Sequence, residues 1–258
     1  MKNKKDNNTS WGNVAKWYDG LIEDSENYQK DLILPNLIRL MNINKDDNIL
    51  DVACGQGFFV REFSKISKNV IGVDISKELI IMAKEHSINN EKYLVSPSHN
   101  LSFFESDSID KISIILAIQN IEKVSETLRE CKKVLKDNGK LYIVLNHPTF
   151  RIPKKSDWGY DPHKGIQFRK IEQYFSEIMV KIDMNPGEKD YKSKKYTFSF
   201  HRSLQYYFKI FNKSGFKVVD LEEWCSNKLS QKGPRKISED KARKEIPMFM
   251  FIELIKSN

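Results

Sequence analysis

Residues 48–59, NILDVACGQGFF, place an aliphatic, strand-like run before two glycines and then resume as an apolar segment that can open a helix. A strand, a glycine-rich turn and a helix bring bare backbone and a helix N-terminus close to a ligand. The dinucleotide-binding pattern G-x-G-x-x-G is incomplete, because Val60 occupies the third glycine position. The stretch therefore predicts a ligand-binding turn and leaves the ligand open.

Short apolar runs alternate with amphipathic segments throughout residues 48–146. The pattern predicts strands and helices in turn: strands at 48–53, 69–74, 91–96, 111–117 and 140–146, and helices at 57–67, 76–88 and 122–136. A further helix is expected at 27–41. Ser76 is the expected N-cap of the second of these core helices, and Gly139 the expected left-handed residue that ends the third. Such alternation indicates an α/β fold, a parallel sheet with helices on both faces.

The alternation stops at residue 148, and the next fifty residues are rich in proline, aromatic and basic residues. A segment of this length predicts a functional lid or an insert, with a plain surface excursion as the alternative. We expect a basic helix at 166–181, a helix at 201–214 ended by Gly215, strands at 216–224 and 246–255, and a loop between those strands. The expected parts are an N-terminal tail and helical cap (1–47), a core (48–147), a lid or substrate insert (148–200) and the rest of the core (201–258).

The net charge is +8 with a pI of about 9.1, but lysine is interleaved with acidic residues along the chain. A nucleic-acid partner is thus an alternative and not the first expectation. Cys54, Cys131 and Cys225 are too few and too far apart for a disulfide framework or a zinc site, so no metal is expected. No apolar run is long enough to span a bilayer and no secretory signal is evident, which predicts a cytoplasmic protein.

Asp74 ends the second expected strand, in VIGVDIS. A carboxylate at this strand tip can accept hydrogen bonds from both hydroxyls of a ribose. The alternative, an N-cap role for Asp74, is less favoured because Ser76 is better placed for it.

The motifs ILDVACGQG, VIGVDIS, SIDKISIILAIQNIEK and VLKDNGKLYIV, taken in order, resemble those of the class I S-adenosylmethionine-dependent methyltransferases. The nearest branch is the small-molecule "type 11", ubiquinone- and menaquinone-like one. The resemblance implies a Rossmann-like three-layer sandwich with a seven-stranded, mostly parallel sheet whose last strand is antiparallel, plus a lid insert. It also implies S-adenosylmethionine (SAM) as cofactor and S-adenosylhomocysteine as product.

The resemblance implies cofactor contacts at the strand ends and turns of the core. These are Asp51, Ala53, Gly55, Gly57, Asp74, Ile75, Ala117 and Gln119. One departure lies after the third strand, where the family usually has an acid for the adenine amino group and this chain has VSPSHNL. Ser98 and His99 are the expected replacements. The segment 10–28 resembles a short aromatic helix that closes over the cofactor, which implies contacts from Tyr18 and Tyr28 or only packing of that helix.

Methyl transfer from a sulfonium needs alignment and exclusion of water, and a base only where the nucleophile must lose a proton. His147 and His201 are the candidate bases, with loop anchoring as the alternative for His147. Candidate substrate residues are polar or aromatic: Asn120, Asn146, Trp158, Tyr160 and Arg202. A small-molecule acceptor is the main expectation. The alternatives are an RNA or protein methyltransferase docking through the basic insert, and a non-catalytic SAM-binding module.

Overall fold

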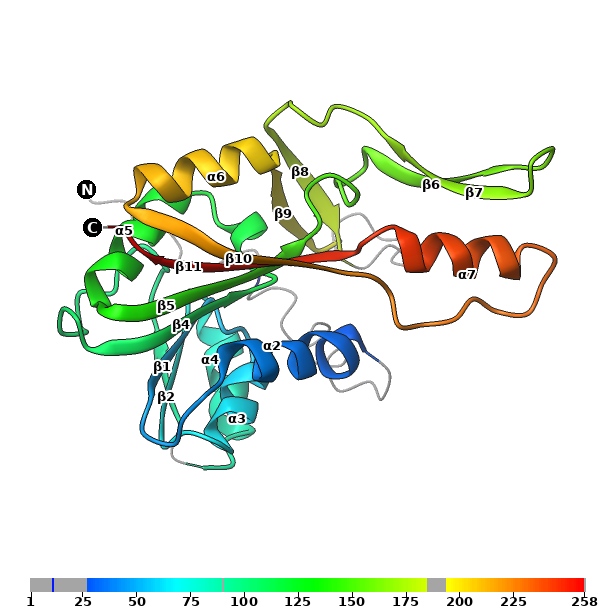
Figure 1. The fold of residues 1–258 in the computed structure, drawn as a ribbon. Helices are drawn as coiled ribbons and strands as arrows, with labels where there is room; N and C mark the ends of the chain where they lie inside the picture. The colour runs from blue at the N-terminus through cyan, green and yellow to red at the C-terminus, as the bar shows by residue number, and fades with distance from the viewer. Residues whose placement is uncertain (1–10, 12–26, 90, 185–193, 258) are drawn as a thin grey trace.

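The structure is a computed structural model that describes residue 11 and residues 27–89, 91–184 and 194–257. Its centre is a seven-stranded sheet in the order β10-β11-β5-β4-β1-β2-β3 (Figure 1). The strands are β1 (Asn48–Val52), β2 (Asn69–Asp74), β3 (Lys92–Val95), β4 (Ile109–Ile115), β5 (Leu135–Asn146), β10 (Phe216–Trp224) and β11 (Phe249–Lys256). Strand β11 runs antiparallel to both of its neighbours, and the pairings among β1 to β5 are parallel. The expected mostly parallel sheet with an antiparallel last strand is confirmed.

Side chains of the central strands alternate between two apolar layers. In β5, Leu141, Ile143 and Leu145 face one buried cluster, and Tyr142 and Val144 face the other. This is the period-two alternation of a strand covered on both faces. A three-layer sandwich results.

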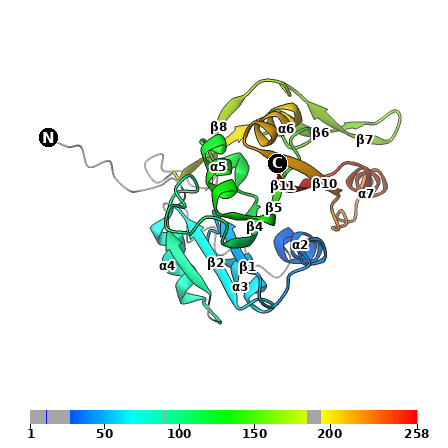
Figure 2. The same ribbon diagram turned by 60° about the vertical axis from the view of Figure 1, so that its left-hand side comes forward.

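Helices cover both faces of the sheet (Figure 2). Four described helical elements pack into the cluster that contains Tyr142 and Val144. They are a π-helical turn at Gln29–Ile33 (η2), α2 (Leu34–Met41), α3 (Phe58–Ser64) and α4 (Lys77–Glu85). Helices α5 (Val124–Val134) and α6 (Leu204–Lys213) pack into the cluster that contains Leu141, Ile143 and Leu145. A short 3-10 turn, η3 (Ile118–Asn120), precedes α5. The Ser76 hydroxyl accepts a hydrogen bond from the Leu79 N–H, so the predicted N-cap of α4 is confirmed.

The expectation for Gly139 is wrong. The chain passes from α5 directly into extended backbone at Leu135, and Gly139 is not among the residues with positive φ. Strand β5 pairs with β4 from its first residue, across an irregularity between Ile109 and Lys111. The backbone groups at the end of α5 therefore need no left-handed cap. Gly215, in contrast, has φ of 80° and follows α6 as predicted.

The insert consists of two antiparallel hairpins, and the helix expected at 166–181 is wrong. Its strands are β6 (Ser156–Asp161), β7 (Ile166–Ile171), β8 (Ile178–Asp183) and β9 (Tyr196–His201). Exposure alternates residue by residue along β7, and Gly165 at φ of 62° turns the first hairpin. Alternating exposure and a glycine turn are typical of a β-hairpin, and the many basic residues of this segment made that pattern hard to recognise in the sequence.

The start of one helix and the presence of another also differ from the sequence expectation. Residues 201–203 complete β9 and cap α6, so the helix expected from 201 begins at Leu204. The expected loop before β11 contains helix α7 (Lys236–Glu245), which lies beside the β6–β7 hairpin (Figure 1). None of the helices in the described ranges has the length and apolar character required to cross a membrane.

Candidate active site

The carboxyl ends of β1, β2 and β4 border a cavity of about 340 Å³. Strand order reverses beside β1, and such a switch point is where open α/β sheets bind ligands. The lining residues come from every segment that leaves this edge and from β9: Trp11, Ala53, Gly55, Asp74, Ile75, Leu79, Ser96, Pro97, Ser98, His99, Ile115, Leu116, Ala117, Asn120, Ile121, Glu122, Lys123, Phe198 and Phe200.

The turn after β1 is built from left-handed backbone. Ala53, Gly55 and Gly57 have φ of 61°, 57° and 82°. Ala53 and Gly55 border the cavity, whereas Gly57 begins α3 and is not among the lining residues. A Cβ at Gly57 would lie 2.6 Å from the Tyr93 ring, so tight packing as well as φ requires glycine there.

Asp74 ties this turn to the end of β2. One carboxylate oxygen accepts the Gly55 N–H at 2.9 Å and the other accepts the Ser76 N–H at 2.8 Å. Burial raises the pKa of Asp74, and the hydrogen bonds from backbone N–H groups oppose that shift. A carboxylate offers about four acceptor positions, so about two are left for a ligand in the cavity that Asp74 borders.

The side wall beyond β3 is formed by residues 96–99. Ser98 and His99 both line the cavity, and the Ser98 hydroxyl shares a hydrogen bond of 2.8 Å with Thr127. Among the residues that the structure describes, the acidic side chains that border this cavity are Asp74 and Glu122, and neither lies in the segment where the family usually has its acid. Glu122 is thus a lining residue that is not among the site residues predicted from the sequence.

The end of β4 supplies the wall nearest the centre of the sheet. Leu116 is in left-handed backbone at φ of 52°, and Ala117 and Asn120 follow it along the cavity. A leucine in this region is strained, and such strain concentrates at functional sites. The Leu116 N–H donates to the Val144 carbonyl of β5, and this bond holds the left-handed conformation. Since Val144 is distant in the sequence, no local sequence signal marks Leu116.

Strand β9 of the insert also borders the cavity, through Phe198 and Phe200. The sequence YTFSFHR at 196–202 predicts aromatic walls, and the period-two alternation of a strand explains why both Phe side chains face the same way. Trp11 also borders the cavity.

Four of the implied cofactor residues do not border this cavity. Asp51 is buried inside the sheet, where the Ser113 hydroxyl donates to it at 2.6 Å, and burial raises its pKa to about 7. Gln119 borders a second, smaller cavity. The Tyr28 hydroxyl is hydrogen-bonded to Ser226, and Gly57 packs on Tyr93. Tyr18 lies outside the described residues.

His147 has no free ring nitrogen in this structure. Its Nδ1 accepts the N–H groups of Thr149 and Phe150, so Nε2 carries the proton and donates to Glu223 at 2.6 Å. The side chain is buried and borders neither cavity, and burial lowers its pKa despite the carboxylate. The expectation that His147 faces the pocket is wrong, because the ring anchors the loop that leaves β5.

The second cavity, of about 30 Å³, is where the other polar candidates gather. It is lined by Gln119, Asn146, Pro148, Arg151, Pro153, Ser199, Phe200, His201, Arg202 and Tyr207. Phe200 also borders the larger cavity, so the two adjoin. His201 donates through Nε2 to the Tyr174 carbonyl at 2.8 Å, and burial lowers its pKa.

The insert aromatics Trp158 and Tyr160 lie on β6, away from both cavities. Arg169 lies 5.1 Å from the Trp158 ring centroid, and Arg235 lies 4.4 Å from that of Tyr160. These contacts stabilise the first hairpin and its packing, and they give no geometric support for a substrate role. Among the described residues, no group of three or more His, Cys, Asp or Glu side chains is arranged to hold a metal ion.

Comparison with known proteins identifies residues 50–143 as matching a methyltransferase domain. The demethylmenaquinone methyltransferase of Staphylococcus aureus is 26% identical over 200 residues, 74% of this chain and 83% of that protein. A SAM-dependent methyltransferase from Mesorhizobium loti superimposes with a TM-score of 0.68 at 21% identity, covering 89% of this chain and 100% of its own. One from Clostridium acetobutylicum has a TM-score of 0.61 at 17% identity, covering 96% and 99%.

The cavity fits the cofactor of these relatives. Its volume lies within the range of small-molecule sites, Asp74 retains acceptor positions for ribose hydroxyls, and Ile75 and Leu79 offer an apolar surface for a base. The domain match, the relative and the fold together support a class I S-adenosylmethionine-dependent methyltransferase.

Proposed function

We propose that this enzyme transfers the methyl group of SAM to a small-molecule acceptor that binds beneath β9. The observation that carries the proposal is that the insert contributes two aromatic side chains to the cavity at the end of β4: Phe198 and Phe200. A concave site with aromatic walls suits a small organic acceptor better than a polymer.

We assign the cofactor contacts to the residues that border the larger cavity. Asp74 accepts the ribose hydroxyls, and Ile75 and Leu79 pack on the adenine, with Ser98 and His99 at its edge. The turn at Ala53 and Gly55 and the segment at Ala117 enclose the methionine end.

The bound cofactor supplies an electrophilic methyl group on a sulfonium. The protein then contributes alignment of the acceptor and exclusion of water, with Phe200 between the two cavities and Asn120 beside the cofactor. His201 is our candidate base, because its Nε2–H is held by the Tyr174 carbonyl and its neutral form leaves a lone pair on Nδ1. Burial lowers the pKa of His201 and so keeps the ring neutral near pH 7.

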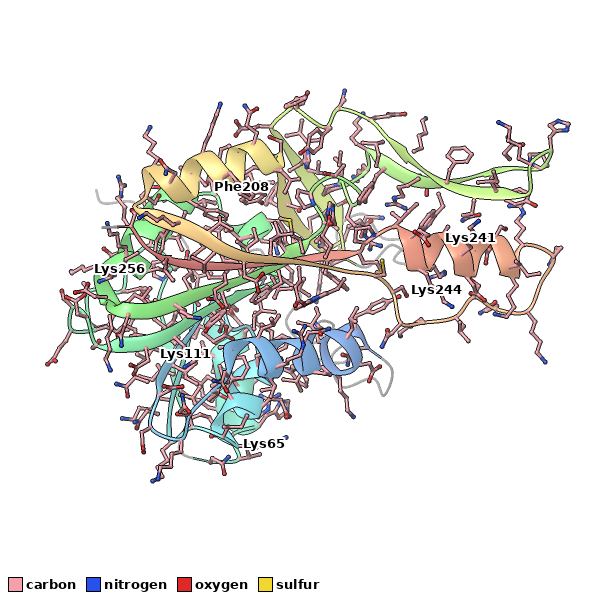
Figure 3. The ribbon with its side chains drawn as sticks, viewed as in Figure 1. Lys65, Lys111, Phe208, Lys241, Lys244 and Lys256 are labelled. Atoms are coloured by element: carbon pink, nitrogen blue, oxygen red, sulfur yellow. The ribbon has the colours of Figure 1, made fainter. Side chains whose placement is uncertain are left out.

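The distribution of charge argues against the RNA or protein alternative. Two of the insert lysines are paired with acids nearby, Lys170 with Glu172 and Lys194 with Asp183, both at 2.5 Å. The lysines labelled in Figure 3 lie just after α3 and on β4, α7 and β11, which are different parts of the molecule. The Staphylococcus aureus relative is named for demethylmenaquinone, a small molecule, and this also supports the proposal.

The test is a search for the acceptor with the full chain. Protein and SAM carrying an isotopically labelled methyl group are incubated with a metabolite extract, with total RNA and with a protein fraction, each analysed by mass spectrometry. We expect label in a metabolite, and its loss with the His201→Gln variant when SAM affinity is retained. Label in RNA or protein alone would overturn the small-molecule assignment.

A further inference from the structure

The second cavity adjoins the cofactor site and has a polar lining. It lies between η3, the end of β5, the first residues of the insert and β9, and Phe200 is common to both cavities. One water molecule needs about 10–15 Å³ of cavity volume. The second cavity, of about 30 Å³, therefore has room for about two groups of that size.

The two arginines in its wall differ in their partners. Arg202 is buried, and its guanidinium donates to the carbonyls of Ile118, Ile121 and Glu122 at 3.4, 3.0 and 3.2 Å. Its role is therefore structural: it fastens the end of β9 to the segment after β4. From the sequence, Arg202 is a candidate either for binding a carboxylate or phosphate or for pairing with Asp or Glu. The structure supports neither, because three of its N–H groups donate to backbone carbonyls.

Arg151 has no such partners. Within the described part of the chain its guanidinium makes no hydrogen bond or ion pair, although the residue is partly buried. Its charged neighbour is Arg169, whose own guanidinium donates to the Phe150 carbonyl and to Ser156. Two neighbouring guanidinium groups with no acid bound to Arg151 favour the binding of an anion.

Gln119, which also lines this cavity, carries a second unsatisfied group. Its Nε2 donates to the Leu116 carbonyl at 2.9 Å, which fixes the amide, and its Oε1 is buried without a partner. A buried polar atom without a partner costs free energy unless a water or ligand satisfies it. The Asn146 amide in the same wall makes no hydrogen bond to the described residues.

We propose that this cavity binds a carboxylate of the methyl acceptor, with Arg151 as its partner. A guanidinium recognises a planar carboxylate through two parallel hydrogen bonds, and two carboxylate oxygens match the room available. Gln119 and Asn146 complete the polar wall, and the rest of the acceptor extends past Phe200 toward the cofactor. This inference rests on the proposed small-molecule function and narrows its substrate class.

The test measures binding of matched probes by calorimetry to the full chain saturated with S-adenosylhomocysteine. The probes are acetate, benzoate and 4-hydroxybenzoate, the three corresponding amides, and phenyl phosphate. We expect at least one carboxylate to bind at least about ten-fold more tightly than its amide, and Arg151→Met to remove that preference. Arg151→Lys should retain part of it, and Arg129→Met, at an exposed arginine of α5, should leave it unchanged.

Three results would overturn the assignment. These are equal binding of every carboxylate and its amide, a preference that survives Arg151→Met, and phenyl phosphate binding more tightly than any carboxylate, which would make the anion a phosphate. Gln119→Glu offers a second variant that keeps Arg151 in place, and its added negative charge should weaken carboxylate binding.

Failure here is separable from failure of the proposed function. A labelled neutral metabolite, turned over equally well by Arg151→Met, would refute the carboxylate subsite and leave the small-molecule methyltransferase intact. Label confined to RNA or protein would refute the proposed function itself.

Discussion

The sheet core and the insert both border the cofactor cavity, but different forces hold them. Core strands such as β4 and β5 are buried on both faces. The insert strands expose large apolar side chains, with Ile166 at 50% and Met179 at 62%. The insert is held instead by a few directed contacts, such as those of Arg202 and His201. Geometry in the core therefore follows from burial, whereas geometry in the insert depends on individual hydrogen bonds.

The largest effect should come from Arg202→Ala, which removes three hydrogen bonds between the end of β9 and the segment after β4. Three backbone carbonyls lose a charged donor, and we expect the free energy of unfolding to fall by about 3 kcal/mol. Chemical denaturation measures this, with Arg129→Ala as the exposed control. Equal stability of the two variants would show that the insert is held in some other way.

Asp74→Ala tests the core side of the site. Loss of a charged acceptor for the ribose and for the Gly55 N–H should weaken SAM binding by about 2 kcal/mol, roughly 30-fold. Calorimetry gives the dissociation constant, and Asp220→Ala on exposed β10 is the matched control. Unchanged affinity would remove Asp74 from the site.

Asp51 makes core stability depend on pH. Its pKa is raised by burial from 3.8 to about 7, so between these values the folded chain holds a proton that the unfolded chain has lost. Its contribution to stability is full below pH 4 and falls as pH rises toward 7, by about 1 kcal/mol per pH unit. Asp51→Asn should flatten this slope in denaturation curves between pH 5 and 7, and an unchanged slope would contradict the assignment.

Phe200→Ala tests whether the insert acts on the acceptor and not on the cofactor. Removing the ring that borders both cavities should lower kcat/KM for the acceptor about ten-fold and leave SAM affinity within about two-fold. Phe200→Leu keeps an apolar side chain and should recover part of the loss. A drop in SAM affinity alone would place Phe200 with the cofactor.

The smallest effect is expected at Trp158. Its ring packs with Arg169 on β6, away from both cavities, so Trp158→Ala should change kcat/KM less than about two-fold and stability by about 0.5–1 kcal/mol. Steady-state kinetics and thermal melting measure the two quantities. A large kinetic loss with normal stability would bring the first hairpin back into the acceptor site.

The alternating pattern of residues 48–146 was sufficient to predict the sheet, the glycine turn, the Ser76 cap and a ligand edge bordered by Gly55, Asp74 and Ala117. Strand ends are local features, and the ends of parallel strands meet at one edge of the sheet whatever the loops do. The insert was harder, because its strands are short, basic and half exposed and so lack a strong apolar period.

Only the tertiary structure decided which polar side chains are free for a ligand. The sequence made His147 and Arg202 candidates for the site, yet both are occupied, by Glu223 and by backbone carbonyls, while Arg151 has no partner among the described residues. A residue's type and position in the chain determine what it can bind. Whether it is already bound depends on which donors and acceptors folding brings within hydrogen-bonding distance, and those come from segments far away in the sequence.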